Sequence, residues 1–258
     1  EPVPLPYFLE GPAKMLASLK DSKEAEKLYK NVKESELYDR KLGMYKTSVP
    51  IDHISMENGR IRAFTAGWLE RESIFLHMEY KYLLSTLEAG LYEEFYKDLP
   101  TAMVAFRDPE EYGRSILENS SFIASSVNPN EAIHGRGYVA RLSGSTSEAI
   151  SIWMMMFMGD KLFSYENNEL VLHLEPKLPG WLFDEDDNAS FTLLSSCKVT
   201  YHNPSRRDIY GQDSPRIEKI RVIDTGEVIE GSNIKGELAS RIRDGKVKEL
   251  VVEYENLH

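Results

Sequence analysis

The chain of 258 residues is 41% hydrophobic and 28% charged, and its formal net charge is −11. This length and composition are typical of a globular protein with one large domain or two smaller ones. The negative charge argues against nucleic acids and anionic membranes as partners, because both are bound through clustered lysine and arginine side chains.

A single cysteine, Cys197, means that no disulfide can form within the chain, which favours a reducing, cytoplasmic compartment. The periplasm is the alternative if an upstream signal was removed, since the numbering starts at a glutamate. The longest apolar block, 152–158, is too short to span a bilayer. The strand-like segment around Cys197 predicts a packed thiol, not a catalytic one.

The first part of the chain, residues 11–159, has helical periodicity interrupted by glycine and proline. Four segments are expected to form helices: 13–33, 68–89, 91–106 and 146–158. Pro100 should interrupt the third helix, because proline removes a backbone donor and clashes with the preceding turn.

After residue 160 the periodicity becomes that of strands. The expected strands lie at 169–176, 189–204, 218–224, 226–231 and 248–255, and a short helix is expected at 236–245. The fold class expected is therefore α+β, with a helical region over 1–160 and an antiparallel β-layer over 161–258 packed on it. The acidic run 184–188 predicts a solvated loop, with calcium binding much less favoured, so no metal site is expected.

The helix expected over 68–89 is apolar on two sides, with a narrow polar stripe between them formed by Glu70, Ser73, His77, Lys81 and Glu88. Such a helix should be largely buried with its stripe facing a cleft or a polar neighbour, a geometry that suits an inner helix of an α/α barrel. Two interpretations remain open. The stripe is a solvated edge with His77 as a hydrogen-bonded core residue, or His77 offers a donor or a positive charge to an anionic ligand.

The segment 108–145 is too long and too polar to be only a connector. It carries groups of the kind that bind sugar hydroxyls: Tyr112, Arg114, Glu118, Asn119, His134, Arg136 and Arg141. The alternative is an ordered surface loop whose charges pair with each other.

The turn at 143–146 leads into the last expected helix. Ser145 and Glu148 fit a capping box, in which each would bond the other's backbone amide. The helix is apolar nearly all round, so its N-terminal amides should be buried and need partners, and a phosphate suits them. Gly144 would let the backbone come close to such an anion.

Five segments, in this order, resemble the C-terminal part of the cellobiose phosphorylase family: 57–96, 112–121, 140–153, 170–183 and 197–204. Members of that family resemble inverting glycoside hydrolases with a six-hairpin α/α toroid, and they cleave or transfer disaccharides with inorganic phosphate. The resemblance implies a partial α/α toroid for the helical region of this chain.

The motifs within those segments imply site residues. His77 matches the family's phosphate-binding histidine in Ile-Phe-x-His, and Ser143-Gly144 matches its Thr-Gly phosphate loop. Glu118 falls on a sugar-contacting glutamate, although the Pro-Tyr after it is missing. Tyr112, Arg141 and Glu70 are further candidates for sugar binding.

The family's general acid, an aspartate in an Asp-Trp-Asn-Asp block, has no counterpart here, nor does its phosphate-binding arginine. The chain is therefore expected to be the C-terminal part of a larger enzyme, with its catalytic residue outside the chain. The expected partners are a disaccharide or oligosaccharide, inorganic phosphate as co-substrate without another cofactor, and the upstream polypeptide. A homodimer is left open.

Two other functions are retained as alternatives. One is an inverting hydrolase on the same scaffold, in which Glu70 or Glu118 would activate water. The other is a non-catalytic carbohydrate-binding or scaffold module.

Overall fold

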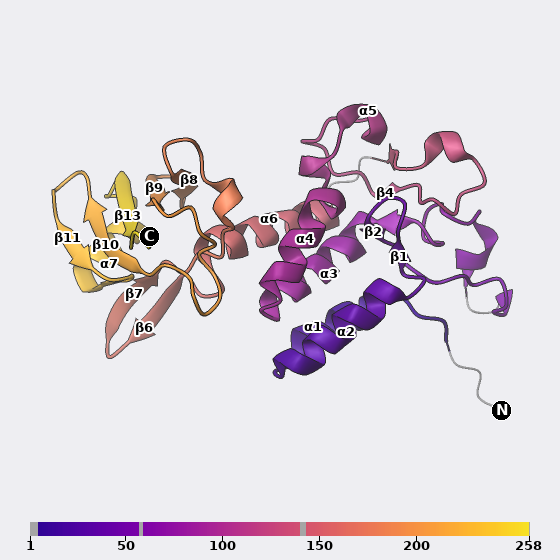
Figure 1. The fold of residues 1–258 in the computed structure, drawn as a ribbon, viewed down its shortest axis with the longest axis horizontal. Coiled ribbons are helices and arrows are strands. Elements are labelled where there is room, and N and C mark those ends of the chain that lie inside the picture. Colours follow the sequence, from indigo (N-terminus) through magenta and orange to yellow (C-terminus); the bar gives the residue numbers. More distant parts are fainter. Residues whose placement is uncertain (1–4, 57–58, 140–142, 258) are drawn as a thin grey trace. The chain divides into compact units, whose positions relative to one another are not determined.

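A computed structural model describes residues 5–56, 59–139 and 143–257, with Ser143 described through its backbone alone. Its contacts divide the chain into a helical unit, residues 1–152, and a β unit, residues 153–258 (Figure 1). The division falls within α6, which covers Ser143–Met158. The expected α+β class is confirmed, and each unit is described by itself below.

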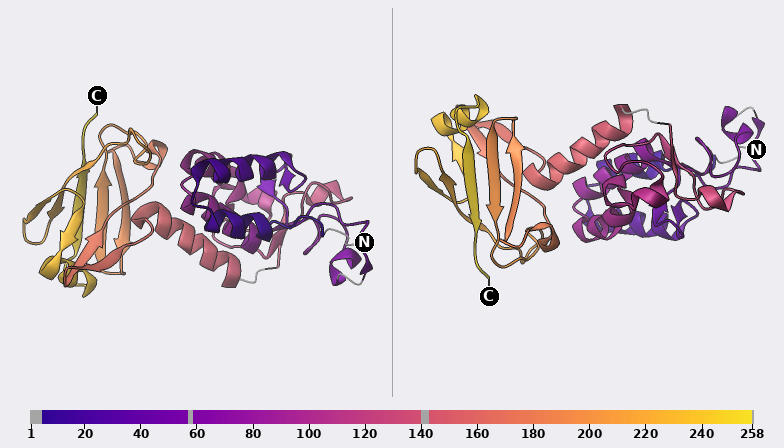
Figure 2. Two further views of the ribbon diagram at one scale, coloured as in Figure 1. Left: turned by 90° about the horizontal axis from the view of Figure 1, so that it is seen from below. Right: turned by 90° about the horizontal axis from the view of Figure 1, so that it is seen from above.

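Besides the start of α6, the helical unit contains five helices in the described residues: α1 (Glu10–Ser18), α2 (Ser22–Glu34), α3 (Leu76–Glu88), α4 (Tyr92–Ala102) and α5 (Pro109–Tyr112). α1 packs against α3, and α3 against α4; Figure 2 shows α1 and α2 side by side. The prediction of one helix over 13–33 is wrong, because the Asp21 carboxylate accepts the backbone N–H groups of Lys23 and Glu24 and starts a second helix there.

The helix predicted over 68–89 begins later, at Leu76, and ends at Glu88. The residues before it form a turn because Leu69 and Glu72 each have a φ of 53°, in the left-handed region that helical residues do not adopt. Glu70 therefore lies off the helix, and so does Ser73. The predicted polar stripe is wrong at these two positions, while His77 remains in the first turn of α3.

Pro100 does not interrupt α4, contrary to the prediction, because the helix continues past it to Ala102. A proline this close to the C-terminal end removes the backbone donor of one residue only in the last turn, so its cost is smaller than in a helix centre. A short 3₁₀ turn, Val104–Phe106, follows.

The long segment after α4 is ordered by a small antiparallel sheet with the strand order β3-β4-β5. Its strands are β3 (Ile74–Phe75), β4 (Phe122–Ile123) and β5 (Gly137–Tyr138). The ring of Trp68 lies 4.8 Å from Phe122 and 4.5 Å from Tyr138, centroid to centroid. This sheet holds both ends of the segment beside the start of α3.

The helical unit also contains a two-stranded hairpin and two further 3₁₀ turns among its described residues. These are β1 (Tyr38–Asp39), β2 (Met44–Tyr45), η2 (Arg60–Ala63) and η4 (Glu131–Ile133). The Asp39 carboxylate accepts from the backbone N–H and the hydroxyl of Ser126, at 2.7 and 2.8 Å. The hairpin is thereby tied to the long segment after α4.

The β unit contains two sheets, and Figure 2 shows the strands within them side by side. The larger has the order β11-β10-β13-β9-β8, and the smaller β12-β7-β6. Their strands are β6 (Phe163–Glu166), β7 (Glu169–His173), β8 (Asn188–Leu193), β9 (Cys197–His202), β10 (Ile217–Val222), β11 (Val228–Glu230), β12 (Asn233–Lys235) and β13 (Glu249–Tyr254). The short helix expected near residue 236 is α7 (Gly236–Arg243), and η5 (Gly180–Leu182) precedes β8.

The expectation of a purely antiparallel layer is wrong at one pair, because β13 runs parallel to β9. The last strand enters the larger sheet between β10 and β9 instead of adding to an edge. The packed thiol expected at Cys197 is confirmed: the residue is fully buried, and burial raises the pKa of its thiol to about 11. The acidic run also forms the predicted loop, in which Asp187 pairs with Arg206 at 2.8 Å.

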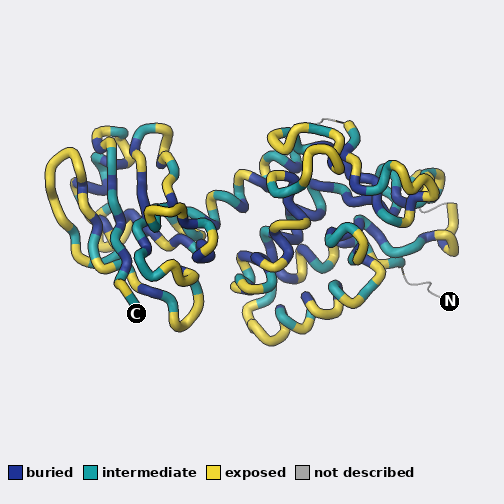
Figure 3. Tube along the Cα trace, turned by 45° about the horizontal axis from the view of Figure 1, so that its top comes forward, coloured by how far each residue is buried: buried dark blue, intermediate teal, exposed yellow. Residues whose placement is uncertain are grey.

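Buried residues occupy the interior of each unit, and exposed residues lie in the turns and along α1 and α2 (Figure 3). None of the helices in the described ranges combines the length and the apolar character that a bilayer span requires.

Glu79 is a fully buried carboxyl group on α3. Its Oε1 accepts the backbone N–H of Tyr45 at 2.9 Å, and its Oε2 has no hydrogen-bond partner within the described residues. Burial raises the pKa of Glu79 well above its ordinary value, and the partial compensation comes from the Tyr45 N–H and the charge of Arg107. The native protein therefore holds this proton more tightly than the unfolded chain does.

Glu79→Gln should make folding less sensitive to rising pH. In the wild type, the contribution of Glu79 is complete below its unfolded pKa of about 4.3 and declines as the pH rises toward the raised native value. Glutamine keeps the acceptor for Tyr45 and has no proton to lose. We expect the unfolding free energy of the variant, compared with that of the wild type, to be higher at pH 8 than at pH 4.5, measured by urea unfolding. The exposed Glu36→Gln should show no such difference, and an equal pH slope in Glu79→Gln would contradict the prediction.

Candidate functional site

His77 and Gly144 are far apart in sequence and lie against each other in the helical unit. His77 is in the first turn of α3, and Gly144 is the second residue of α6. A Cβ built on Gly144 would be 2.6 Å from Nδ1 and 2.7 Å from Cγ of His77. The imidazole ring thus occupies the space that any side chain at position 144 would need.

Glu148, one turn further along α6, lies near Nε2 of the same imidazole. Its Oε1 is 3.5 Å from Nε2 of His77, and the histidine side chain is 34% exposed. The pair is ionic when the imidazole is protonated. His77, Gly144, Ser145 and Glu148 together are called the His77 site below.

The capping box predicted for Ser145 and Glu148 is not formed. The helix already begins at Ser143, so Ser145 lies inside its first turn. Ser145 is only 3% exposed, and its hydroxyl has no hydrogen-bond partner among the residues that the structure describes. An unbonded buried hydroxyl is uncommon in proteins, and a water or a ligand is one way to satisfy it.

Asn119 connects the two helices of the site. Its Oδ1 accepts from the hydroxyl of Tyr80 on α3 at 3.1 Å, and its Nδ2 donates to Oγ1 of Thr146 on α6 at 3.4 Å. The Tyr80 hydroxyl in turn accepts the backbone N–H of Val104 at 3.1 Å. These bonds fix the start of α6 against α3, and so fix Gly144 against His77.

The arrangement has the chemistry of an oxyanion site. The first backbone N–H groups of a helix have no partners within the helix, and the helix dipole places partial positive charge there. An imidazole and a buried hydroxyl beside these amides add two further donors. A tetrahedral oxyanion such as phosphate is a ligand that an imidazole and the first amides of a helix can bind. The side chain of Ser143 and the whole of Arg141 lie outside the described residues.

Glu70, expected to bind sugar, lies in the turn before β3 and pairs with Arg60. Its Oε1 is 2.6 Å from Nη2 of Arg60, and its Oε2 accepts from Nε at 3.3 Å. The pair is exposed, so either partner is free to exchange with solvent or a ligand. The structure does not bring Glu70 into contact with His77 through any bond between described atoms.

Tyr112 and Glu118 are linked to each other. Tyr112 has no exposed surface; its hydroxyl donates to the backbone carbonyl of Glu118 and accepts the N–H of Ser120, each at 2.8 Å. Its bonds are satisfied internally, which makes it a core residue that shapes the loop. The Glu118 carboxylate is partly exposed and lies 3.3 Å from Nη2 of Arg114.

Sequence reasoning missed the role of Glu148 beside His77 and of Asn119 between the helices. The spacing of Ser145 and Glu148 predicts a local capping box. Nothing in the linear sequence indicates that Glu148 instead pairs with His77 on α3. Within the described ranges, no group of three or more histidine, cysteine or carboxylate side chains is arranged to hold a metal ion.

No protein-family model matches this sequence, and no curated protein is significantly similar to it.

Proposed function

We propose that this chain supplies the phosphate-binding part of a carbohydrate-active enzyme that cleaves a β-linked disaccharide or oligosaccharide by phosphorolysis with inversion. The general acid is expected from a segment outside this chain. The helices of the helical unit would then form part of an α/α toroid.

The observation that carries this proposal is the contact between His77 and Gly144. The sequence singled out these two residues separately, and the fold brings them within van der Waals contact at the first turn of α6. The unbonded hydroxyl of Ser145 adds a donor for which the described residues provide no acceptor. An anion at this point would accept from the imidazole and from the first amides of α6.

The chemistry of inversion explains why hydrogen-bond donors, without a general base, would be enough at the phosphate position. In an inverting hydrolase one carboxylic acid protonates the leaving oxygen, while a second carboxylate activates water on the opposite face of the sugar. Phosphate already carries negative charge and needs orientation instead of a base. His77 and the amides of α6 would hold it in line with the scissile bond, and Glu148 would keep the imidazole oriented.

The test is the phosphate dependence of cleavage by the full-length protein on β-linked disaccharides. We expect a sugar 1-phosphate as product and no cleavage without phosphate. In His77→Ala the apparent phosphate affinity should fall by roughly tenfold to a hundredfold, since a hydrogen bond to a charged group is worth about 1.5–3 kcal/mol.

The exposed His53→Ala is the matched control and should leave the phosphate affinity unchanged. Cleavage that proceeds equally without phosphate would replace phosphorolysis by hydrolysis. Binding of oligosaccharide without any cleavage by the full-length protein would favour a non-catalytic module.

A further inference from the structure

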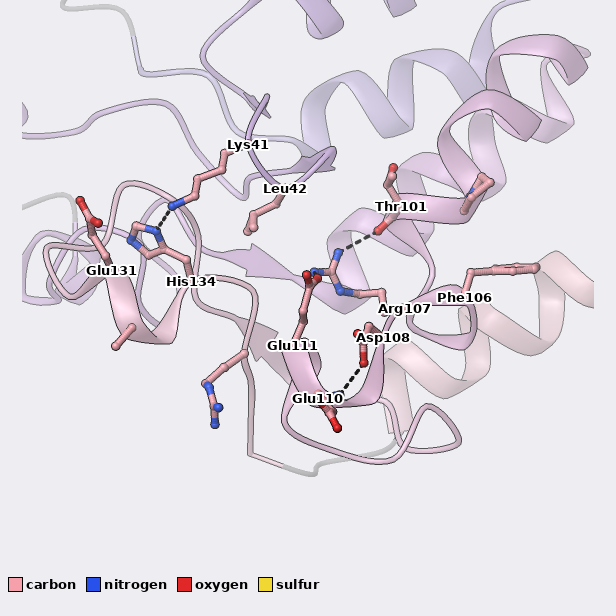
Figure 4. Close-up of a pocket in the computed structure, with 13 residues that line it drawn as sticks. Lys41, Leu42, Thr101, Phe106, Arg107, Asp108, Glu110, Glu111, Glu131 and His134 are labelled. Atoms are coloured by element: carbon pink, nitrogen blue, oxygen red, sulfur yellow. Dashed lines mark hydrogen bonds and ion pairs between the residues drawn. The ribbon is translucent and has the colours of Figure 1, made fainter.

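A second polar cleft lies elsewhere in the helical unit, with a volume of about 570 Å³. The C-terminal end of α4, the segment 106–111, the turn at 131–136 and the β1–β2 hairpin form its walls. Figure 4 shows Arg107 beside Glu111 on one side and Lys41 beside His134 on the other. This is called the Arg107 cleft. Its volume is within the range of small-molecule sites.

Arg107 is a largely buried cation whose charge also acts on the buried carboxyl group of Glu79. Its side chain is 7% exposed, and the one carboxylate within 4 Å among the described residues is that of Glu111, at 3.8 Å from Nη2. That carboxylate is 70% exposed and too distant for a hydrogen bond. A guanidinium removed from water to this degree is normally paired and fully hydrogen-bonded.

The unsatisfied donors of Arg107 lie on one edge of the guanidinium. Nη1 donates to the carbonyl of Thr101 at 3.2 Å and to Sδ of Met44 at 3.4 Å. Nε is buried and has no partner in the part of the chain that the structure describes, and Nη2 has only the distant Glu111. Nε and Nη2 are the pair that binds a carboxylate or a phosphate side-on through two parallel bonds.

The backbone of Gly135 comes close to that edge. Gly135 has a φ of 81°, and a Cβ there would be 3.2 Å from Nη2 of Arg107. Across the cleft, Nζ of Lys41 is 2.9 Å from Nδ1 of His134, whose Nε2 is 2.8 Å from the carbonyl of Asn128. This arrangement fits a neutral imidazole that donates through Nε2 and accepts from the lysine, and it leaves the other lysine protons available.

The carboxylates that line the Arg107 cleft are exposed. Asp108 caps α5, with Oδ1 accepting the backbone N–H of Glu110 at 2.8 Å. Glu110, Glu111 and Glu131 are exposed, so water screens their charges. Exposed carboxylates next to basic groups are also acceptors for the hydroxyl groups of a sugar.

We propose that the Arg107 cleft binds a small sugar that carries an anionic group, a sugar phosphate or a sugar acid. The anionic group lies on the Nε–Nη2 edge of Arg107, where it replaces the carboxylate of Glu111. The sugar hydroxyls reach Lys41 and the carboxylates of the rim. α5 is a single turn, so Glu111 can move aside without unfolding a long helix. This site is distinct from the His77 site and does not depend on the proposed function.

The test is calorimetric titration of the protein with glucose 6-phosphate, gluconate and uncharged glucose at low ionic strength. We expect one or both anionic sugars to bind and glucose not to bind. Glu111→Gln should tighten binding by roughly threefold to tenfold, because it removes the competing carboxylate. The exposed Glu110→Gln on the same turn is the matched control and should change affinity less.

Arg107→Lys should weaken binding by about tenfold or more, since lysine keeps the charge and lacks the side-on edge. Thermal unfolding checks that the Arg107→Lys protein is folded, because the substituted side chain is buried. If that protein does not fold, Glu111→Gln still tests the proposal. Equal effects of Glu111→Gln and Glu110→Gln, or equal binding of glucose, would overturn the proposal. The titration is repeated in His77→Ala: retained binding supports the Arg107 cleft, whereas lost binding assigns the ligand to the His77 site and overturns it.

Discussion

Asp98→Ala should lower the free energy of unfolding by about 3–5 kcal/mol, the cost typical of removing one partner from a buried ionic cluster. Asp98 lies on α4, and its side chain is 3% exposed. Its Oδ2 accepts from the hydroxyl of Tyr29 at 2.9 Å and from that of Tyr45, and its Oδ1 pairs with Lys33. One carboxylate thus joins α2, β2 and α4.

The partners of Asp98 have no obvious substitute. Burial above all raises the pKa of Tyr29 and Tyr45, so both phenols stay protonated and act as donors. Nζ of Lys33 also lies 3.7 Å from the ring centroid of Tyr38. Without the carboxylate, two buried hydroxyls lose this acceptor, and the Lys33 ammonium keeps a hydrogen bond of 3.4 Å to the Tyr45 hydroxyl and its contacts with the rings.

Urea unfolding of three variants measures this effect. The exposed Glu93→Ala on the same helix should change the unfolding free energy by less than about 0.5 kcal/mol. Asp98→Asn should fall between the two, because the amide oxygen still accepts from a phenol but carries no charge. A loss in Asp98→Ala no larger than in Glu93→Ala would show that the cluster does not stabilise the fold.

The strands of the β unit could be predicted because their signal is local. The segments 189–204 and 248–255 carry alternating or β-branched residues, and 248–255 forms β13, whereas 189–204 forms two strands, β8 and β9, separated by a turn at Leu194 and Ser195. The order of the strands could not be predicted, since the insertion of β13 beside β9 depends on contacts between residues distant in sequence. Local periodicity contains no information about which strands become neighbours.

The prediction of a helix over 68–89 was wrong for its first eight residues, for a different reason. Its apolar residues follow a helical period through the turn, but Leu69 and Glu72 adopt positive φ angles that only the surrounding structure can impose. The Arg71 guanidinium, which donates to the carbonyls of Arg62 and Phe64, shows the kind of tertiary contact involved. Glu70 was expected on a face of this helix, but it lies in the turn before the helix begins.

The candidate site could be predicted in part, because His77 and Gly144 each have a local feature: a polar residue on an apolar helix, and a glycine at a helix start. Tyr112 could not be distinguished as a core residue, since a tyrosine in a polar loop has the same sequence pattern whether its hydroxyl is buried or free. Its two internal hydrogen bonds are visible only in the fold.

Gly144→Ala should weaken phosphate binding at the His77 site while leaving the fold intact. The new methyl group would lie 2.6 Å from Nδ1 of His77, so the imidazole must turn away. The φ angle at Gly144 is not in the left-handed region, and alanine is the better helix former, so the backbone itself is not strained. We expect phosphate affinity to fall by more than about tenfold, measured by calorimetry.

Gly11→Ala provides the matched control, because Gly11 is also the second residue of a helix and a Cβ there meets nothing within 4 Å. It should leave phosphate affinity unchanged. The double variant Gly144→Ala/His77→Ala separates packing from binding: removing the ring relieves the clash and restores any stability lost in Gly144→Ala, yet phosphate affinity stays low. Undiminished phosphate affinity in Gly144→Ala would mean that the imidazole does not contribute to the anion site, because this substitution displaces the ring and leaves the helix amides in place.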